Sequence, residues 1–219
     1  MFRQVLFTHW KWARLELGVY AVVAFVIPTG FMKAFAMQAG TGTVSIASAM
    51  DASVGLGVFL ATLAFIAGTT LSVRPWTMDQ ARQHVFPLSL PVAWPAFVRL
   101  RFLAGATLLL VPAVAAWLGG VLASVAIALP DTLHAYPASI AARFLGAALV
   151  FYAAVFAVQY LAGRRAPVIV AGALVTLLLV ELVGQGMTGS SPMFAVWKAV
   201  TTWPGPFEVL TARWMLVDV

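Results

Sequence analysis

Five long apolar runs alternate with short polar segments along the chain. Each run holds about 20 residues or more, the length at which an α-helix crosses roughly 30 Å of hydrocarbon. The pattern therefore predicts an all-α integral membrane protein, a polytopic bundle of five or six transmembrane helices. We expect the third run, the longest, to tilt or to break at Pro112 or at Gly119-Gly120. The predicted spans are Leu17–Ala36, Val54–Val73, Phe102–Leu129, Phe144–Ala162 and Pro167–Met187.

Composition narrows the class of protein further. Hydrophobic residues make up 63% of the 219 residues and charged residues only 9%, and the mean hydropathy is +0.98. A soluble domain carries about 25% charged residues, so this chain has no room for a sizeable water-facing domain. We therefore expect residues 1–219 to form a single transmembrane domain.

Residues that carry enzyme and metal chemistry are scarce. The chain has no Cys, and its three histidines, His9, His84 and His134, are too far apart for the usual zinc spacings. The sequence contains no evident acid pair, no nucleophile beside a base and no phosphate-binding glycine loop. We therefore expect neither an enzyme nor a metal or cofactor site.

The basic residues are distributed unevenly between the segments that flank the runs. With the N-terminus inside, nine of the thirteen Lys and Arg residues face the cytoplasm and four face outward. Cytoplasmic segments of membrane proteins are enriched in Lys and Arg, so we expect this orientation, in the inner (plasma) membrane of the cell. The net charge of +6 is then explained by topology and indicates no nucleic-acid partner. The nine are Arg3, Lys11, Arg14, Arg74, Arg82, Arg99, Arg101, Arg164 and Arg165.

The first sixteen residues form an amphipathic pattern at helical spacing. One side carries Arg3, Gln4, Thr8, Lys11 and Arg14, and the other Phe2, Val5, Leu6, Trp10 and Ala13. Residues 1–16 therefore suit a helix that lies in the lipid headgroup plane. An ordinary lead-in to the first span predicts the same distribution, so the pattern does not separate the two interpretations.

Residues 74–101 form a cytoplasmic segment between the second and third spans. Its first part, Arg74–His84, predicts a short helix that begins at Pro75, with Asp79 and Arg82 able to pair within one turn. Its narrow apolar stripe fits a groove on a soluble partner better than lipid. Three prolines, at 87, 91 and 95, then end the helix, and Trp94, Phe97, Arg99 and Arg101 form a collar at the interface. The predicted partner-docking residues are Met78, Asp79, Ala81, Arg82 and Val85.

The stretch "FPLSLPVAWPAFVRLRFLAG" carries a family resemblance. It is similar to the region that follows a Leu-Pro-hydrophobic-Ser motif in permease subunits of ATP-binding-cassette transporters of the second exporter class. Phe86-Pro87-Leu88-Ser89 matches that motif with Phe for Leu, and Arg99 or Arg101 takes the basic position where the third span begins. The motif covers about thirty residues, while the order of spans and the N-terminal helix resemble the family over nearly the whole chain.

The resemblance implies a half-transporter. Two such subunits pair, as a homodimer or a heterodimer, and each rests its cytoplasmic helix in a cleft of a separate ATPase subunit. The family usually has six spans, whereas residues 188–219 are too polar for a straight sixth span and predict an outer amphipathic tail. Residues 192–203 and 207–217 of this tail are predicted to form two half-helices.

Glu181 is the one acid well inside a predicted span, where a carboxylate costs roughly 2.5–3.5 kcal/mol. It either lines a translocation path or bonds to a neighbouring helix or to Gln185. The five-span count also leaves a second function open: a non-transporting scaffold subunit of a larger membrane complex, such as a respiratory or photosynthetic assembly.

Overall fold

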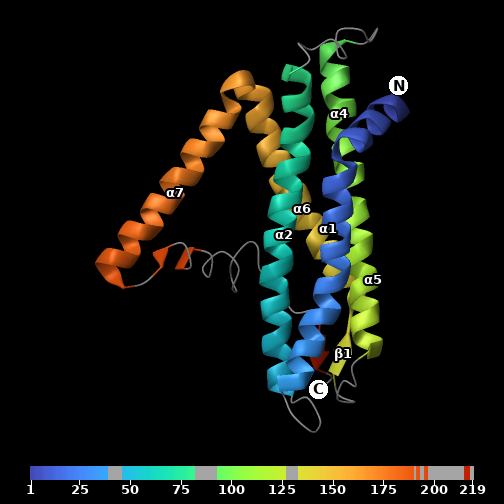
Figure 1. The fold of residues 1–219 in the computed structure, drawn as a ribbon, viewed down its shortest axis with the longest axis vertical. Helices are drawn as coiled ribbons and strands as arrows, with labels where there is room; N and C mark the ends of the chain where they lie inside the picture. The colour runs from blue at the N-terminus through green and yellow to red at the C-terminus, as the bar shows by residue number, and fades with distance from the viewer. Residues whose placement is uncertain are drawn as a thin grey trace.

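A computed structural model describes residues 1–38, 46–81, 93–126, 133–189, 191–192, 195–196 and 215–217 of the chain. The described residues are almost entirely helical, and two short strands pair near one end of the helices (Figure 1). The elements are α1 (Phe2–Gln38), α2 (Ile46–Ala81), α4 (Trp94–Leu108), α5 (Leu110–Ala126), β1 (Leu133–Ala135), α6 (Pro137–Ala162), the 3-10 turn η1 (Gly163–Arg165), α7 (Ala166–Thr188) and β2 (Met215–Val217).

Five helical segments are long and apolar enough to cross a membrane, which confirms the all-α fold and the five spans. They are Phe2–Ala34, Gly55–Asp79, Trp94–Ala126, Pro137–Ala162 and Val168–Met187. Each overlaps a span predicted from the sequence. The tail beyond Thr188 is described at only a few residues, so a sixth span in residues 197–214 lies outside the described part of the chain.

The third span breaks at Leu109, between α4 and α5. Pro112 lies four residues after Leu108 and has no backbone N–H to donate to the Leu108 carbonyl, so one helical hydrogen bond is missing there. The amide of Leu109 still bonds to the carbonyl of Gly105 at 3.3 Å, which keeps the two helices nearly continuous. The predicted break near Pro112 is confirmed.

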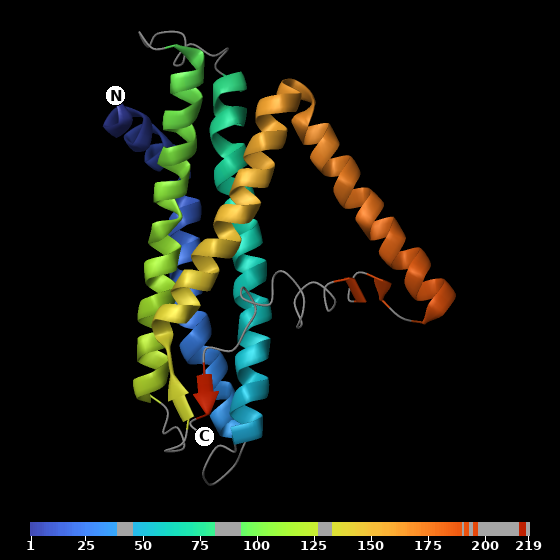
Figure 2. The same ribbon diagram turned by 180° about the vertical axis from the view of Figure 1, so that it is seen from behind.

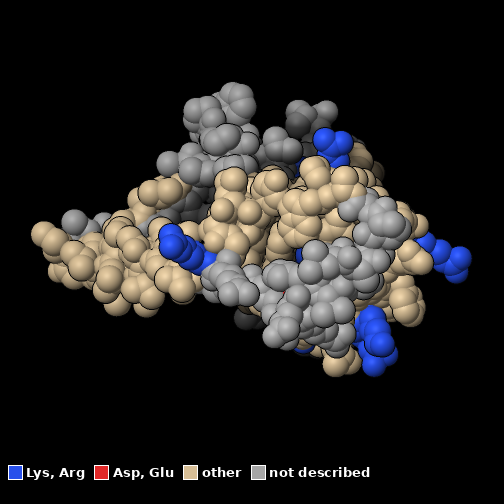
Figure 3. Space-filling model, turned by 90° about the horizontal axis from the view of Figure 1, so that it is seen from above, with Lys and Arg blue, Asp and Glu red and all other residues tan. Residues whose placement is uncertain are grey.

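The helices run up and down between two ends of the bundle (Figures 1 and 2). The N-terminus, the last turns of α2, the first turns of α4 and the α6–α7 turn lie together at one end, which we call the basic end. Seen from this end, Lys and Arg side chains lie around the rim of the described surface (Figure 3). The described Lys and Arg residues of this end are Arg3, Lys11, Arg14, Arg74, Arg99, Arg101, Arg164 and Arg165.

The opposite end holds the two strands. Leu133–Ala135 pairs antiparallel with Met215–Val217, with His134 opposite Leu216. This pairing places the end of the tail beside the α5–α6 connection, far from the N-terminus (Figure 2). It also corrects the predicted half-helix 207–217, because Met215–Val217 is extended and takes its backbone partners from β1.

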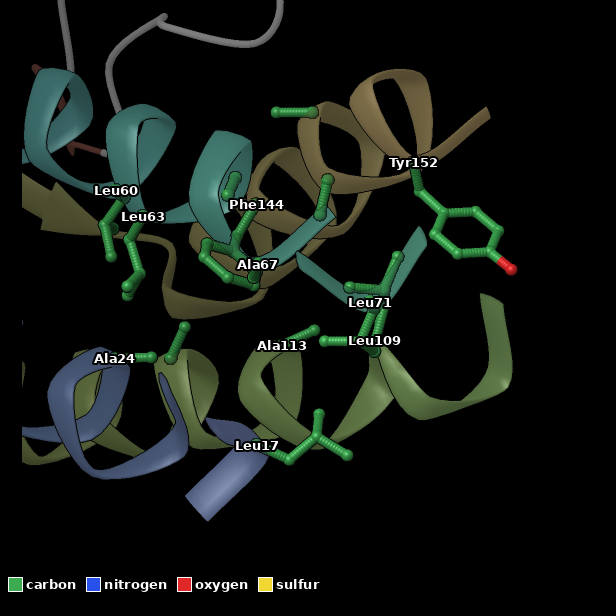
Figure 4. Packing of buried hydrophobic residues seen from close by; sticks show 14 of the residues in the cluster. Leu17, Ala24, Leu60, Leu63, Ala67, Leu71, Leu109, Ala113, Phe144 and Tyr152 are labelled. Atoms are coloured by element: carbon green, nitrogen blue, oxygen red, sulfur yellow. The ribbon is translucent and has the colours of Figure 1, made fainter. Parts of the chain in front are cut away.

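Small residues allow the helices of the bundle to pack closely. At Gly119 of α5, a Cβ atom would collide with the carbonyl oxygen of Phe25 in α1, and the Thr29 hydroxyl donates to the Gly119 carbonyl at 3.3 Å. Gly68 of α2 lies equally close to the backbone of α6 at Ala148. Figure 4 shows buried Leu and Ala side chains filling the space between these helices. Gly68 therefore allows the second span to pack tightly against α6.

The fifth of the described apolar spans, in α7, stands apart from the other four. Gly163 ends α6 with a φ of 53°, a left-handed conformation that glycine adopts readily, and the chain then turns sharply into α7. From this turn α7 diverges from the bundle (Figures 1 and 2). None of its described side chains between Val168 and Met187 is buried.

Candidate functional site

The N-terminal residues belong to one long helix. α1 continues without interruption from Phe2 to Gln38, and its first turns lean away from the axis of the rest (Figure 1). Val5, His9, Ala13 and Leu17, spaced four apart, are all buried against the bundle. The lead-in interpretation of residues 1–16 therefore agrees with the structure, while a location in the headgroup plane remains a prediction.

The sequence predicted a separate helix that begins at Pro75, and this prediction is wrong. α2 runs through Pro75 to Ala81, so Arg74–Ala81 forms its last two turns. Pro75 is tolerated inside the helix because only its bond to the Leu71 carbonyl is lost and its ring is buried. The Thr77 hydroxyl caps no amide; it donates to the Arg74 carbonyl at 2.9 Å.

A buried ion pair joins these last turns of α2 to the first turns of α4. Arg101 Nη1 lies 2.6 Å from Asp79 Oδ2, and the two side chains are 1% and 2% exposed. Arg101 lies 22 residues further along the chain than Asp79, whereas Arg82, the partner predicted for Asp79, lies outside the described residues.

Aromatic rings surround Arg101. Its guanidinium carbon lies 4.3 Å from the centre of the Trp76 ring and 5.7 Å from that of Phe97, both within cation–π range. Trp94 contacts Trp76 and Phe97 in turn. The predicted interfacial collar is therefore only partly correct: Trp94 and Arg99 are exposed, but Phe97 and Arg101 point into the bundle.

Helix α6 closes the same cluster from another side. The Tyr152 hydroxyl lies 3.4 Å from the carbonyl oxygen of Arg101 and 3.2 Å from that of Phe102, and it donates to this pair of acceptors. A Cβ atom on Gly105, one turn further along α4, would collide with this hydroxyl. Tyr152 therefore fixes the backbone of α4 next to Arg101.

Helix α1 completes the surroundings of the ion pair. Val5 packs with Phe97 and Ala104 of α4 in a small apolar cluster. His9, one turn further along α1, is buried at 3% exposure, and Arg101 is among the charges that act on it. On the outside of the same end, Arg74 of α2 pairs with Glu16 of α1 at 3.2 Å. Helices α1, α2, α4 and α6 thus all meet at the Asp79–Arg101 pair.

The predicted partner-docking residues fall into three groups. Met78 is half-buried on the last turns of α2, and Asp79 is buried in the ion pair, so Asp79 does not belong to an exposed surface in this structure. Ala81 ends α2, but its side chain, together with Arg82 and Val85, lies outside the described part of the chain. The docking role itself remains a prediction.

Glu181 is not part of this cluster. It lies on α7 and accepts a hydrogen bond of 2.7 Å from the side-chain amide of Gln185, one turn further along the helix. This is one of the bonds that the sequence predicts, while a role in a translocation path stays untested. Among the described residues, no three His, Cys, Asp or Glu side chains lie close enough to hold a metal ion.

Sequence reasoning missed the Asp79–Arg101 pair, because the predicted spans ended at Val73 and began again at Phe102 and so left both charges outside. In the structure the apolar helices extend to Asp79 and begin at Trp94, and charges at such positions are costly unless paired. The pair joins, at the basic end, the last turns of α2 to the first turns of α4. Comparison of the chain with protein-family models, curated proteins and solved structures finds no match.

Proposed function

We propose that the chain is the membrane permease subunit of an ATP-driven exporter of the ATP-binding-cassette type. It pairs with a second permease subunit, and the segment between α2 and α4 docks on a separate ATPase subunit. On this proposal the basic end faces the cytoplasm and the membrane is the inner membrane of the cell. The motif around Pro87 and Ser89 and the five apolar helices support it.

The Asp79–Arg101 pair also supports the proposal. A segment that receives force from a soluble partner must be firmly connected to the spans that it moves. α2 ends two residues after Asp79, and α4 begins seven residues before Arg101. The ion pair between these two residues, with the guanidinium of Arg101 also over the ring of Trp76, supplies such a connection.

Met78 tests the docking surface. Met78→Asp places a charge on the apolar stripe of the predicted docking helix, and we expect the ATPase to be lost when the tagged chain is purified from its own membrane. The matched control is Ala138→Asp, at the opposite end of the bundle, where Ala138 is exposed in the first turn of α6 and an acidic side chain is well tolerated. Equal recovery of the ATPase with both variants would contradict docking through Met78.

Cysteine labelling tests the orientation, and the absence of natural Cys gives a clean background. A membrane-impermeant thiol reagent is expected to label Ala138→Cys in intact cells. It should label Ala96→Cys, which is exposed at the basic end, only after the membrane is permeabilised. The reverse pattern would place the basic end outside.

A scaffold subunit of a larger membrane complex is the alternative function. Five apolar helices among the described residues, and a span in α7 with no buried side chain described, are features of a chain that offers packing surface to neighbours. Purification separates the two functions: the scaffold would be recovered with a large assembly that contains no ATP-binding-cassette ATPase under any condition.

A further inference from the structure

We infer that the Asp79–Arg101 pair has a positioning role: it sets the register of the end of α2 against the start of α4. The stability of the bundle does not depend on the pair as a whole. The inference deepens the proposed function, on which its meaning for transport rests. The positioning itself follows from the contacts of the pair and is measurable without any partner.

The energetics of buried ion pairs supply the first step. Asp79 and Arg101 are both almost completely removed from solvent. Removing two charges from water costs several kcal/mol for each ion, and the attraction between them repays this only in part. Apolar residues of similar volume often replace such pairs with no loss of stability. A gain in folding stability therefore does not explain why this ion pair is present, because apolar side chains join the helices elsewhere in the bundle.

The directionality of the contacts supplies the second step. Apolar side chains allow helices to slide past each other by small amounts, whereas an ion pair at 2.6 Å forms in only one register. The guanidinium is held over the Trp76 ring, and Tyr152 fixes the backbone of α4 at Arg101, so neither partner adapts easily to a shift. A slide of one helical turn, about 5.4 Å, would separate the charges completely.

The position of the pair supplies the third step. It lies at the end of α2 and near the start of α4. Asp79 and Arg101 flank residues 80–100 in the sequence, so the pair brings the two sides of that segment together. Fixing the register at this point fixes the distance and the angle between the end of α2 and the start of α4. Elsewhere, contacts such as Gly68 against α6 and Gly119 against α1 hold the helices without any charge.

The test combines stability and geometry in one pair of variants. The double variant Asp79→Leu with Arg101→Met removes both charges at similar volume. Spin labels at Thr77→Cys, exposed near the end of α2, and at Ala96→Cys, exposed near the start of α4, report the distance between the two helices. We expect the double variant to melt at or above the temperature of the parent, while its distance distribution becomes broader. The charge-reversed variant, Asp79→Arg with Arg101→Asp, is expected to return the distribution toward that of the parent.

Two results would overturn the inference: failure of the double variant to fold, which would make the pair a stabilising contact, or a distance distribution as narrow as that of the parent. The functional arm uses the ATPase that co-purifies with the parent chain, reconstituted in lipid vesicles. There the double variant should retain the ATPase but lose its permease-dependent ATP hydrolysis. If no ATPase accompanies the parent, the proposed function fails, and the spin-label distances still decide the positioning role.

Discussion

Replacing Arg101 alone with methionine is expected to lower the free energy of unfolding by about 3–5 kcal/mol. The single change removes the countercharge of Asp79, which is 2% exposed, and the carboxylate then remains in an apolar surrounding. The loss of the guanidinium from the face of Trp76 adds to the effect. Titration of the purified protein with SDS in mixed micelles measures the unfolding free energy.

Arg99→Met is the matched control for this prediction. Arg99 lies on the same helix, two residues before Arg101, but its side chain is exposed. Removing it should change the unfolding free energy by no more than about 0.5 kcal/mol. A similar loss in both variants would mean that the unfolding free energy depends on the overall charge of α4 and that the buried pair makes no contribution of its own.

The second large effect is expected at Gly119. Gly119→Ala introduces a Cβ atom that collides with the carbonyl oxygen of Phe25, so α1 and α5 must separate and the Thr29 hydroxyl loses its acceptor. Overpacking of this kind typically costs about 1–3 kcal/mol of unfolding free energy. The same SDS titration gives the measurement.

Gly172→Ala separates this collision from the general effect of alanine in a helix. Nothing lies within 4 Å of a Cβ atom at Gly172, on the exposed helix α7. Because alanine favours helices over glycine by up to about 1 kcal/mol, this control should be neutral or slightly stabilising. If Gly119→Ala behaved like Gly172→Ala, the close approach of α1 and α5 would be disproved.

The five spans were predictable because hydropathy is a property of each segment by itself. The break near Pro112 was predictable for the same reason, since the missing amide of a proline acts on its own helix. Pro75 shows the limit of this reasoning: its sequence surroundings suit a helix start, but burial against the bundle keeps it inside α2. Tertiary packing, which a local pattern does not contain, decides between the two.

The candidate site shows the same limit more clearly. Helical spacing placed Asp79 on the polar side of a thin amphipathic helix, with Arg82 as its nearest cation. In the structure, α4 brings Arg101 to Asp79, a partner that the pattern of the helix alone does not contain, while Arg82 lies outside the described residues. His9 and Tyr152 join them from α1 and α6. A periodic pattern gives the face of a residue on its own helix, but it does not give the helix that covers that face.

The break at Leu109 divides the third span into two rods with different attachments. The rod at the basic end, α4, is tied to α2 through Arg101 and to the first turns of α1 through Phe97. The other rod, α5, is tied to the middle of α1 through Gly119. Bending a regular helix would break a backbone hydrogen bond, but the Leu108 carbonyl already lacks its donor at residue 112. The third span therefore has, about halfway along its length, a point at which it can bend without losing a further backbone hydrogen bond, so α4 can follow the end of α2 while α5 keeps its place against α1.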